Sequence, residues 1–197
     1  QGGDISEPVS QATLRIVKVF WGLDSSLAYR RHFPAINWLT SYSLYKDKLE
    51  EWFNANVARD WNAVTGEAMR ILSVESELEE IVKLVGVDAL SPNERLTLEA
   101  ARSVREDFLQ QNAFEDGDSY TSLDKQYRLI KLILSFYKKS GDALKRGADI
   151  EKIADLPVRE KIGRAKSADP EKYAAEYEDI DREITAELAA LTDKEDR

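Results

Sequence analysis

From about Leu44 onward, apolar residues recur every three or four positions, a spacing that places them on one face of an α-helix. Glycine, proline and helix-capping residues separate four such stripes. The stripes consist of Val74, Leu78, Ile81, Val82 and Val85; of Leu98, Ala101, Val104 and Phe108; of Leu123, Tyr127, Ile130, Leu134 and Tyr137; and of Tyr173, Tyr177, Ile180, Ile184, Leu188 and Leu191. The pattern predicts a bundle of amphipathic helices.

Local signals predict where these helices begin and end. Gly86 ends the first, and Ser91 with Glu94 forms a capping box that starts the second. The third is expected to run from Leu123 to Arg146, where a glycine follows, and the last to open at Asp169-Pro170 with an acidic outer face.

The first 45 residues have a different pattern. Leu14–Leu23 is rich in β-branched and aromatic residues and is predicted to be a buried strand, with a short helix as the alternative. A short helical patch at Ser25–Arg31 and an irregular aromatic loop at His32–Leu39 follow, and Pro34 disfavours helical geometry at Phe33. The predicted architecture is mainly α, a helical bundle preceded by about 45 residues of strand and loop.

Composition narrows the possible chemistry. The 197 residues include no cysteine and one histidine, His32, which excludes thiol nucleophiles, histidine metal cages and a Ser-His-Asp triad. No two glycines lie five positions apart, so the chain has no P-loop. A structural hydrogen-bonding role is favoured for His32, and one cluster of carboxylates is interpreted as a solvated helix face: Glu75, Glu77, Glu79 and Glu80. We predict no catalytic residue and no metal site.

The net charge of −9 is unevenly distributed, since residues 1–48 carry a net +2 and the remainder −11. A chain without a concentrated basic face is not expected to bind nucleic acid. No apolar run approaches the roughly 20 residues that cross a bilayer, so we expect a soluble protein without direct membrane insertion. The sequence around Gln1 is typical of a loop interior, and we expect a piece of a longer protein.

Two segments combine large aromatic side chains with an irregular local pattern, Phe33-Pro34 and Leu109–Phe114. Aromatic rings on loops are suited to stacking on a flat ligand or to contacting a partner. The alternative, that both segments simply cover the core, is the more common outcome for such residues. The pattern alone leaves both interpretations open.

Several long strings of residues closely resemble the C-terminal third of the catalytic A subunit of the archaeal and bacterial A/V-type rotary ATPase. The strings are Gly2–Val9, Leu14–Trp21, Arg31–Leu39, Ser41–Ser43, Glu75–Leu78 with Glu80–Val82, Asp88–Pro92, Arg105–Phe114 and Leu156–Gly163. They occur in the family's order, whereas the final helix matches only by pattern. The resemblance implies that residues 1–45 end the P-loop nucleotide-binding domain and that residues 46–197 form the C-terminal helical domain.

By this resemblance, Phe33 and Phe114 sandwich the adenine ring of a nucleotide, and Gln111 and Ala113 line its edge. The cofactors implied for the complete subunit are ATP or ADP with Mg²⁺, and this chain would require none by itself. The groups that handle phosphate and Mg²⁺ would lie in preceding sequence, and the arginine finger in the neighbouring B subunit. We therefore expect no catalysis by the isolated chain.

The turn between the first two helices is similar to the rotor-facing loop of rotary ATPases. Its residues are Asp88, Ala89, Leu90, Ser91, Pro92, Asn93 and Glu94. The corresponding loop of F-type beta subunits is more acidic, so charge alone would not explain rotor contact here. We expect the turn to be a protruding tip at one end of a helix from Ser91 to about Leu109.

The resemblance also implies partners and a location. Three such subunits would alternate with three B subunits around a rotating central stalk, at the cytoplasmic face of the cell membrane, and couple ATP synthesis or hydrolysis to proton or sodium transport. The strand Leu14–Leu23 would then lack its sheet neighbours, so residues 1 to about 45 are expected to be mobile or to pair with a second copy. The alternative function is a stand-alone acidic helical adaptor that binds protein partners and makes no nucleotide contact at Phe33 or Phe114.

Overall fold

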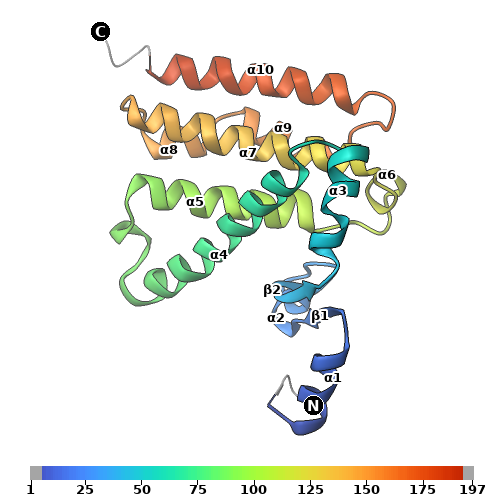
Figure 1. The fold of residues 1–197 in the computed structure, drawn as a ribbon. Helices are drawn as coiled ribbons and strands as arrows, with labels where there is room; N and C mark the ends of the chain where they lie inside the picture. Colours follow the sequence, from blue (N-terminus) through green and yellow to red (C-terminus); the bar gives the residue numbers. More distant parts are fainter. Residues whose placement is uncertain (1–5, 193–197) are drawn as a thin grey trace.

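The computed structural model describes residues 6–192 and consists of a two-stranded hairpin attached to a larger helical unit (Figure 1). The N-terminal part contains α1 (Pro8–Ile16), β1 (Val19–Leu23), α2 (Ser25–Tyr29) and β2 (Ile36–Ser43). The helical unit contains α3 (Lys46–Asn56), α4 (Trp61–Val85), η1 (Val87–Ala89), α5 (Pro92–Ser103), η2 (Val104–Leu109), α6 (Asp116–Ser119), α7 (Leu123–Lys145), α8 (Ile150–Ala154), α9 (Val158–Arg164), η3 (Ala165–Ser167) and α10 (Tyr173–Thr192). The predicted mainly α architecture is confirmed. Residues 1–5 of the predicted strand-and-loop part, and with them the start of the string Gly2–Val9, lie outside the described residues.

The predicted strand Leu14–Leu23 is wrong in its extent and its burial. Its first residues belong to α1, because Pro8 at the first helical position starts a helix that includes them. Within this segment only Val19–Leu23 forms a strand, and the side chains of Trp21 and Leu23 are exposed. The β-branched and aromatic composition indicated a strand but carried no information about which face would be covered.

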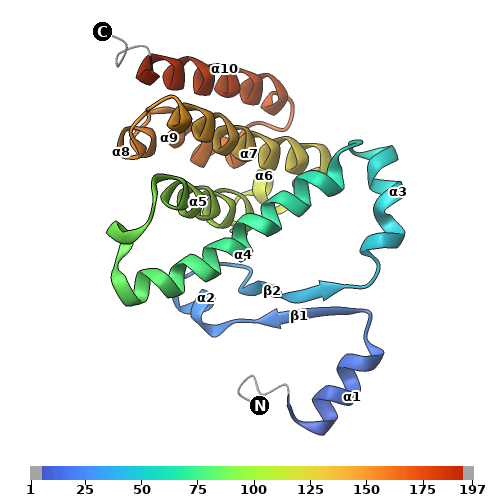
Figure 2. The same cartoon turned by 60° about the vertical axis from the view of Figure 1, so that its left-hand side comes forward.

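The strand does not lack a neighbour, contrary to our expectation. β1 pairs antiparallel with β2, with Val19 opposite Ser43 and Leu23 opposite Ile36 (Figure 2). The end of the predicted loop His32–Leu39 therefore lies in a strand. Along one edge of each strand, the backbone groups form hydrogen bonds with the other strand of the same chain. That edge therefore does not require pairing with a second copy.

The helical unit is layered, with α7 between α5 and α10 and with α4 crossing α5 and α7 (Figures 1 and 2). One continuous core joins these helices to α8 and α9. The largest of its fully buried apolar side chains are Ile71, Leu72, Val104, Ile133, Ile153, Val158, Ile184 and Leu188. Burying one such side chain contributes about 1.5–3 kcal/mol, so this core supplies the main stabilisation of the helical unit.

The predicted helix ends are mostly confirmed. α7 runs from Leu123 to Lys145, and Gly147 follows with a φ of +97° that favours glycine. α10 begins at Tyr173, later than predicted, because Asp169 caps the preceding turn: its carboxylate accepts a hydrogen bond from the Glu171 N–H at 2.8 Å.

Helix α4 departs from the prediction at three positions. Glu75, which we assigned to a solvated face, is only 5% exposed. Ile81 and Val85, which we assigned to the apolar stripe, are 43% and 64% exposed. α4 crosses α5 obliquely, so its last turns lie away from the core (Figure 2). Apolar residues therefore continue at helical spacing along α4 beyond the part of the helix that packs against α5.

Candidate functional site

The two aromatic segments, far apart in sequence, meet in the structure. The backbone N–H of Gln111 donates a hydrogen bond to the carbonyl of Phe33 at 2.7 Å. The side chain of Phe33 is 52% exposed and that of Phe114 is 97% exposed, and Gln111 and Ala113 are also exposed. Neither aromatic ring covers the core, which favours a contact with something outside the described residues.

The chain reaches Phe33 through a tight end of α2. The N–H of Arg31 donates to the carbonyl of Ala28 at 3.0 Å, and the N–H of His32 donates to the carbonyl of Leu27 at 2.9 Å. Arg31 has a φ of +60°. Together these features form a Schellman motif in which an arginine occupies the left-handed position that usually holds glycine. The turn directs His32 inward, where its side chain is buried.

Side chains from two other elements, η3 and α6, and one from the segment itself hold the backbone that carries Phe114. The Lys166 ammonium donates to the carbonyl of Gln110 at 3.1 Å, and the Asn112 N–H donates to the Asp118 carboxylate at 2.6 Å. The Phe114 N–H donates to the side-chain carbonyl of Asn112 at 3.1 Å. The backbone is therefore ordered while the Phe114 ring is left in solvent.

A cavity of about 250 Å³ lies beside the point where the two segments meet. Its lining combines apolar side chains with polar ones, and includes Pro34, Phe108, Leu109, Gln111, Asp118 and Lys166. Apolar walls with a few polar groups are typical of sites that bind planar organic ligands.

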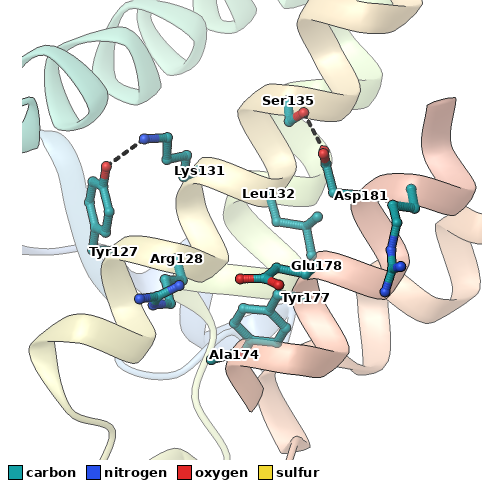
Figure 3. Close-up of a pocket in the computed structure, with 10 residues that line it drawn as sticks. Tyr127, Arg128, Lys131, Leu132, Ser135, Ala174, Tyr177, Glu178 and Asp181 are labelled. Carbon is teal, nitrogen blue, oxygen red and sulfur yellow. Dashed lines mark hydrogen bonds between the residues drawn. The ribbon is translucent and has the colours of Figure 1, made fainter. Parts of the chain in front are cut away.

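A larger cavity of about 650 Å³ lies between α7 and α10 and is lined by none of the predicted site residues (Figure 3). Some of its polar groups pair with one another. The Ser135 hydroxyl donates to Asp181 at 2.6 Å, and Lys131 donates to the Tyr127 hydroxyl at 2.6 Å (Figure 3). The first of these bonds joins α7 to α10 and helps to fix the two helices against each other, whereas the second lies within α7.

Within residues 6–192, no group of three or more histidine, aspartate or glutamate side chains could hold a metal ion. In the same part of the chain, no helix combines the length and apolarity needed to cross a membrane.

The structure gives the predicted rotor-contact turn a rigid form. Leu90 is buried, and the Asp88 carboxylate pairs with Arg95 at 3.1 Å. The capping box is complete: the Ser91 N–H donates to the Glu94 carboxylate at 2.7 Å, and the Glu94 N–H donates to the Ser91 hydroxyl at 3.4 Å. The turn thus joins α4 to α5 with the start of α5 anchored.

Sequence analysis missed exposed apolar side chains beside this turn. They are Leu84, Val85 and Val87. The signal was available, because apolar residues from Val82 to Val87 are denser than a single helical face requires. At this end of α4 the exposed surface beside the turn is apolar as well as charged.

Comparison with known proteins separates the same two parts of the chain, the N-terminal part and the helical unit. The C-terminal domain of V and A type ATP synthase matches residues 50–154, and the nucleotide-binding domain of the ATP synthase alpha/beta family matches residues 1–43. The V-type ATP synthase alpha chains of Acetivibrio thermocellus and Clostridioides difficile are each 61% identical to this chain over 98% of its length. An ATP synthase subunit, NeqB from Nanoarcheaum equitans, has a similar fold, with a TM-score of 0.58 and 24% identity over 70% of this chain and 32% of NeqB.

The chain belongs to the V and A type ATP synthase family. It spans about a third of the length of the alpha chains it matches, 33% in both cases above. This membership favours the rotary ATPase interpretation over the adaptor interpretation.

Proposed function

We propose that this chain completes the adenine pocket of the catalytic subunit of a rotary V-type ATP synthase and couples that pocket to rotation of a central stalk. The observation that carries the proposal is the hydrogen bond from the Gln111 N–H to the Phe33 carbonyl, which brings two exposed aromatic segments together. The alpha chains it resembles, and the matching nucleotide-binding domain, support the same conclusion.

In this proposal Phe33 and Phe114 stack on the two faces of the adenine ring. The Gln111 side chain offers a donor and an acceptor to the ring edge, and Ala113 leaves room for it. The rings are exposed in this structure, as a ligand that inserts between them requires. The ATP phosphates and Mg²⁺ would be bound by other parts of the complete subunit, so we expect the isolated chain to hydrolyse no ATP.

We also propose the domain boundaries, the partner subunits and the location that the family implies. Residues 1–45 would end the nucleotide-binding domain, and residues 46–197 would form the C-terminal helical domain. The partners would be B subunits in an alternating hexamer and the subunits of the central stalk, at the cytoplasmic face of the cell membrane. Proton or sodium transport would be coupled to ATP synthesis or hydrolysis by that assembly.

The turn Asp88–Glu94 is our proposed contact with the stalk. It lies at the N-terminal end of α5, and the segment Gln110–Phe114 follows the C-terminal end of η2. Eighteen residues from Pro92 to Leu109 separate the two, about 27 Å at 1.5 Å per residue.

Lengthening the turn by three glycines should uncouple rotation from hydrolysis and leave the KM for ATP unchanged. Cysteine cross-linking from Ala89 to the stalk tests the contact, and failure in every rotational state would refute it.

Replacing Phe33 or Phe114 by alanine in the complete assembly tests the adenine pocket. Loss of base stacking should weaken binding by about 1–3 kcal/mol, seen as a raised KM for ATP with kcat largely retained. Exposed Tyr29→Ala is a matched control, because it removes an aromatic ring outside the two segments. An unchanged KM in both phenylalanine variants would overturn the proposal.

A further inference from the structure

A buried ion pair links α4 to the π-helical turn η2. The Arg105 guanidinium donates from Nε to both carboxylate oxygens of Glu75, at 3.0 and 3.1 Å, and its Nη2 forms an ion pair with Oε1 of Glu75 at 2.9 Å. Glu75 is the buried member of the otherwise exposed carboxylate cluster. Burial raises the pKa of its carboxyl group, and the Arg105 charge opposes that shift. A guanidinium held at two oxygens has a fixed orientation.

The backbone of Arg105 is the point at which the N-terminal part contacts this turn. Its carbonyl accepts the hydrogen bond that closes the turn, from the Gln110 N–H at 2.9 Å, and is also 3.0 Å from Nε2 of His32. A carbonyl can only accept, so the Nε2 atom carries the proton in this contact. The His32 ring is buried and packs against Trp38 with 5.6 Å between ring centroids.

His32 directly precedes Phe33, and the next contact along the chain reaches the other end of the same turn. The Phe33 carbonyl accepts from the Gln111 N–H, six residues after Arg105. Two adjacent residues of the N-terminal part are thus joined to the two ends of one π-helical turn. Turns of this type are frequent at functional sites, because they re-aim the chain within a helix.

We propose that Glu75 and His32 are positioning residues for the adenine site: Glu75 orients Arg105, the Arg105 carbonyl holds His32, and His32 fixes the backbone from which Phe33 projects. This inference rests on the proposed function for the identity of the ligand. A buried ion pair contributes little net stability compared with apolar residues of the same size. The orientation of Arg105 is therefore the effect that we assign to Glu75.

The structural half of the proposal can be tested without nucleotide. His32 is the only histidine of the 197 residues, so its side-chain nitrogen resonances can be assigned without ambiguity in the full chain. We expect the Nε2–H tautomer, and we expect Glu75→Gln to shift the His32 resonances, because an amide cannot accept at both atoms from Arg105. Glu77→Gln, an exposed position on the same helix, is the matched control and should leave them unchanged.

The functional half requires the complete assembly. His32→Leu removes the donor, whereas His32→Gln places an amide N–H near the position of Nε2. Loss of one such hydrogen bond should raise the KM for ATP about 2- to 10-fold with kcat largely retained in Glu75→Gln and His32→Leu. His32→Gln should restore most of the affinity, and Glu77→Gln should match the parent. The His32 pair keeps the test valid if Glu75→Gln fails to fold.

The two proposals can fail separately. If Phe33→Ala raises the KM while Glu75→Gln and His32→Leu do not, the positioning role is wrong and the adenine site stands. If neither Phe33→Ala nor Phe114→Ala raises the KM, the adenine site is wrong. An unchanged His32 resonance in a folded Glu75→Gln chain would overturn the link from Glu75 to His32 whatever the ligand.

Discussion

The helical unit and the N-terminal hairpin use apolar residues in opposite ways. Ile133 on α7 and Ile184 on α10 are almost completely buried, whereas Trp21 and Leu23 on β1 and Tyr29 on α2 lie mostly in solvent. Helices satisfy their backbone groups internally and here cover one another, whereas a two-stranded hairpin leaves outer edges and a face uncovered. An exposed apolar surface of this kind marks an interaction face rather than a finished core.

Single substitutions should produce the largest contrast between the two parts. Ile133→Ala in the full chain should lower the free energy of unfolding by about 2–5 kcal/mol, because it leaves a cavity in the helical core. Leu23→Ala removes an exposed side chain and should change that free energy by less than about 0.5 kcal/mol. Urea unfolding followed by circular dichroism measures both, and equal effects would show that the hairpin is as well packed as the bundle.

Hydrogen exchange sharpens the same comparison. We expect the β1 and β2 amides to exchange at least about 100-fold faster than those in the middle of α7, equivalent to about 2.7 kcal/mol, because opening the hairpin exposes little additional apolar surface. The comparison should be made on a chain shown to be monomeric. Uniformly slow exchange from Leu14 onward would contradict this.

A smaller effect is expected where α4 and α5 join. Ser91→Ala removes the hydroxyl that caps the Glu94 N–H and should cost about 1 kcal/mol in unfolding free energy. Ser73→Ala is a matched control at an exposed serine in the middle of α4, outside any helix cap. Equal losses in the two variants would show that the cap does not anchor the turn.

The smallest expected effect is on the pH dependence of stability. The hydrogen bond from the Tyr127 hydroxyl, at 2.6 Å, and the nearby Lys131 lower the pKa of Asp60, although burial opposes this. A carboxyl group with a lowered pKa in the folded chain stabilises above its ordinary pKa, and the contribution is lost as the pH falls below about 4. Asp60→Asn should therefore flatten the acid limb of the stability curve. A limb as steep as the parent's would contradict the assignment.

The sequence predicts more of the helical unit than of the N-terminal hairpin, because helix ends depend on local signals and strand pairing does not. The start of α5 follows from the capping box at Ser91, and the end of α7 follows from Gly147, because these signals act over a few residues. β2 was not predicted, since pairing with β1 depends on residues far away in sequence.

At the candidate site, the aromatic positions Phe33 and Phe114 were evident from sequence and resemblance, but the support beneath them was not. Glu75 belongs to a run of carboxylates that periodicity alone assigns to solvent. Its burial depends on Arg105, thirty residues later, and on a π-helical turn that no local pattern indicated. Long-range pairing of charged groups is the part of this site that required the structure.

The central claim is that Phe33 and Phe114 hold the adenine ring, and photolabelling tests it most directly. The complete assembly would be irradiated with an azido-adenine nucleotide bound at its catalytic sites, and the labelled peptides would be identified by mass spectrometry. We predict labelling within the segments that contain Phe33 and Gln111–Phe114, reduced by excess ATP. Labelling confined to other parts of the assembly, with neither segment modified, would contradict the claim.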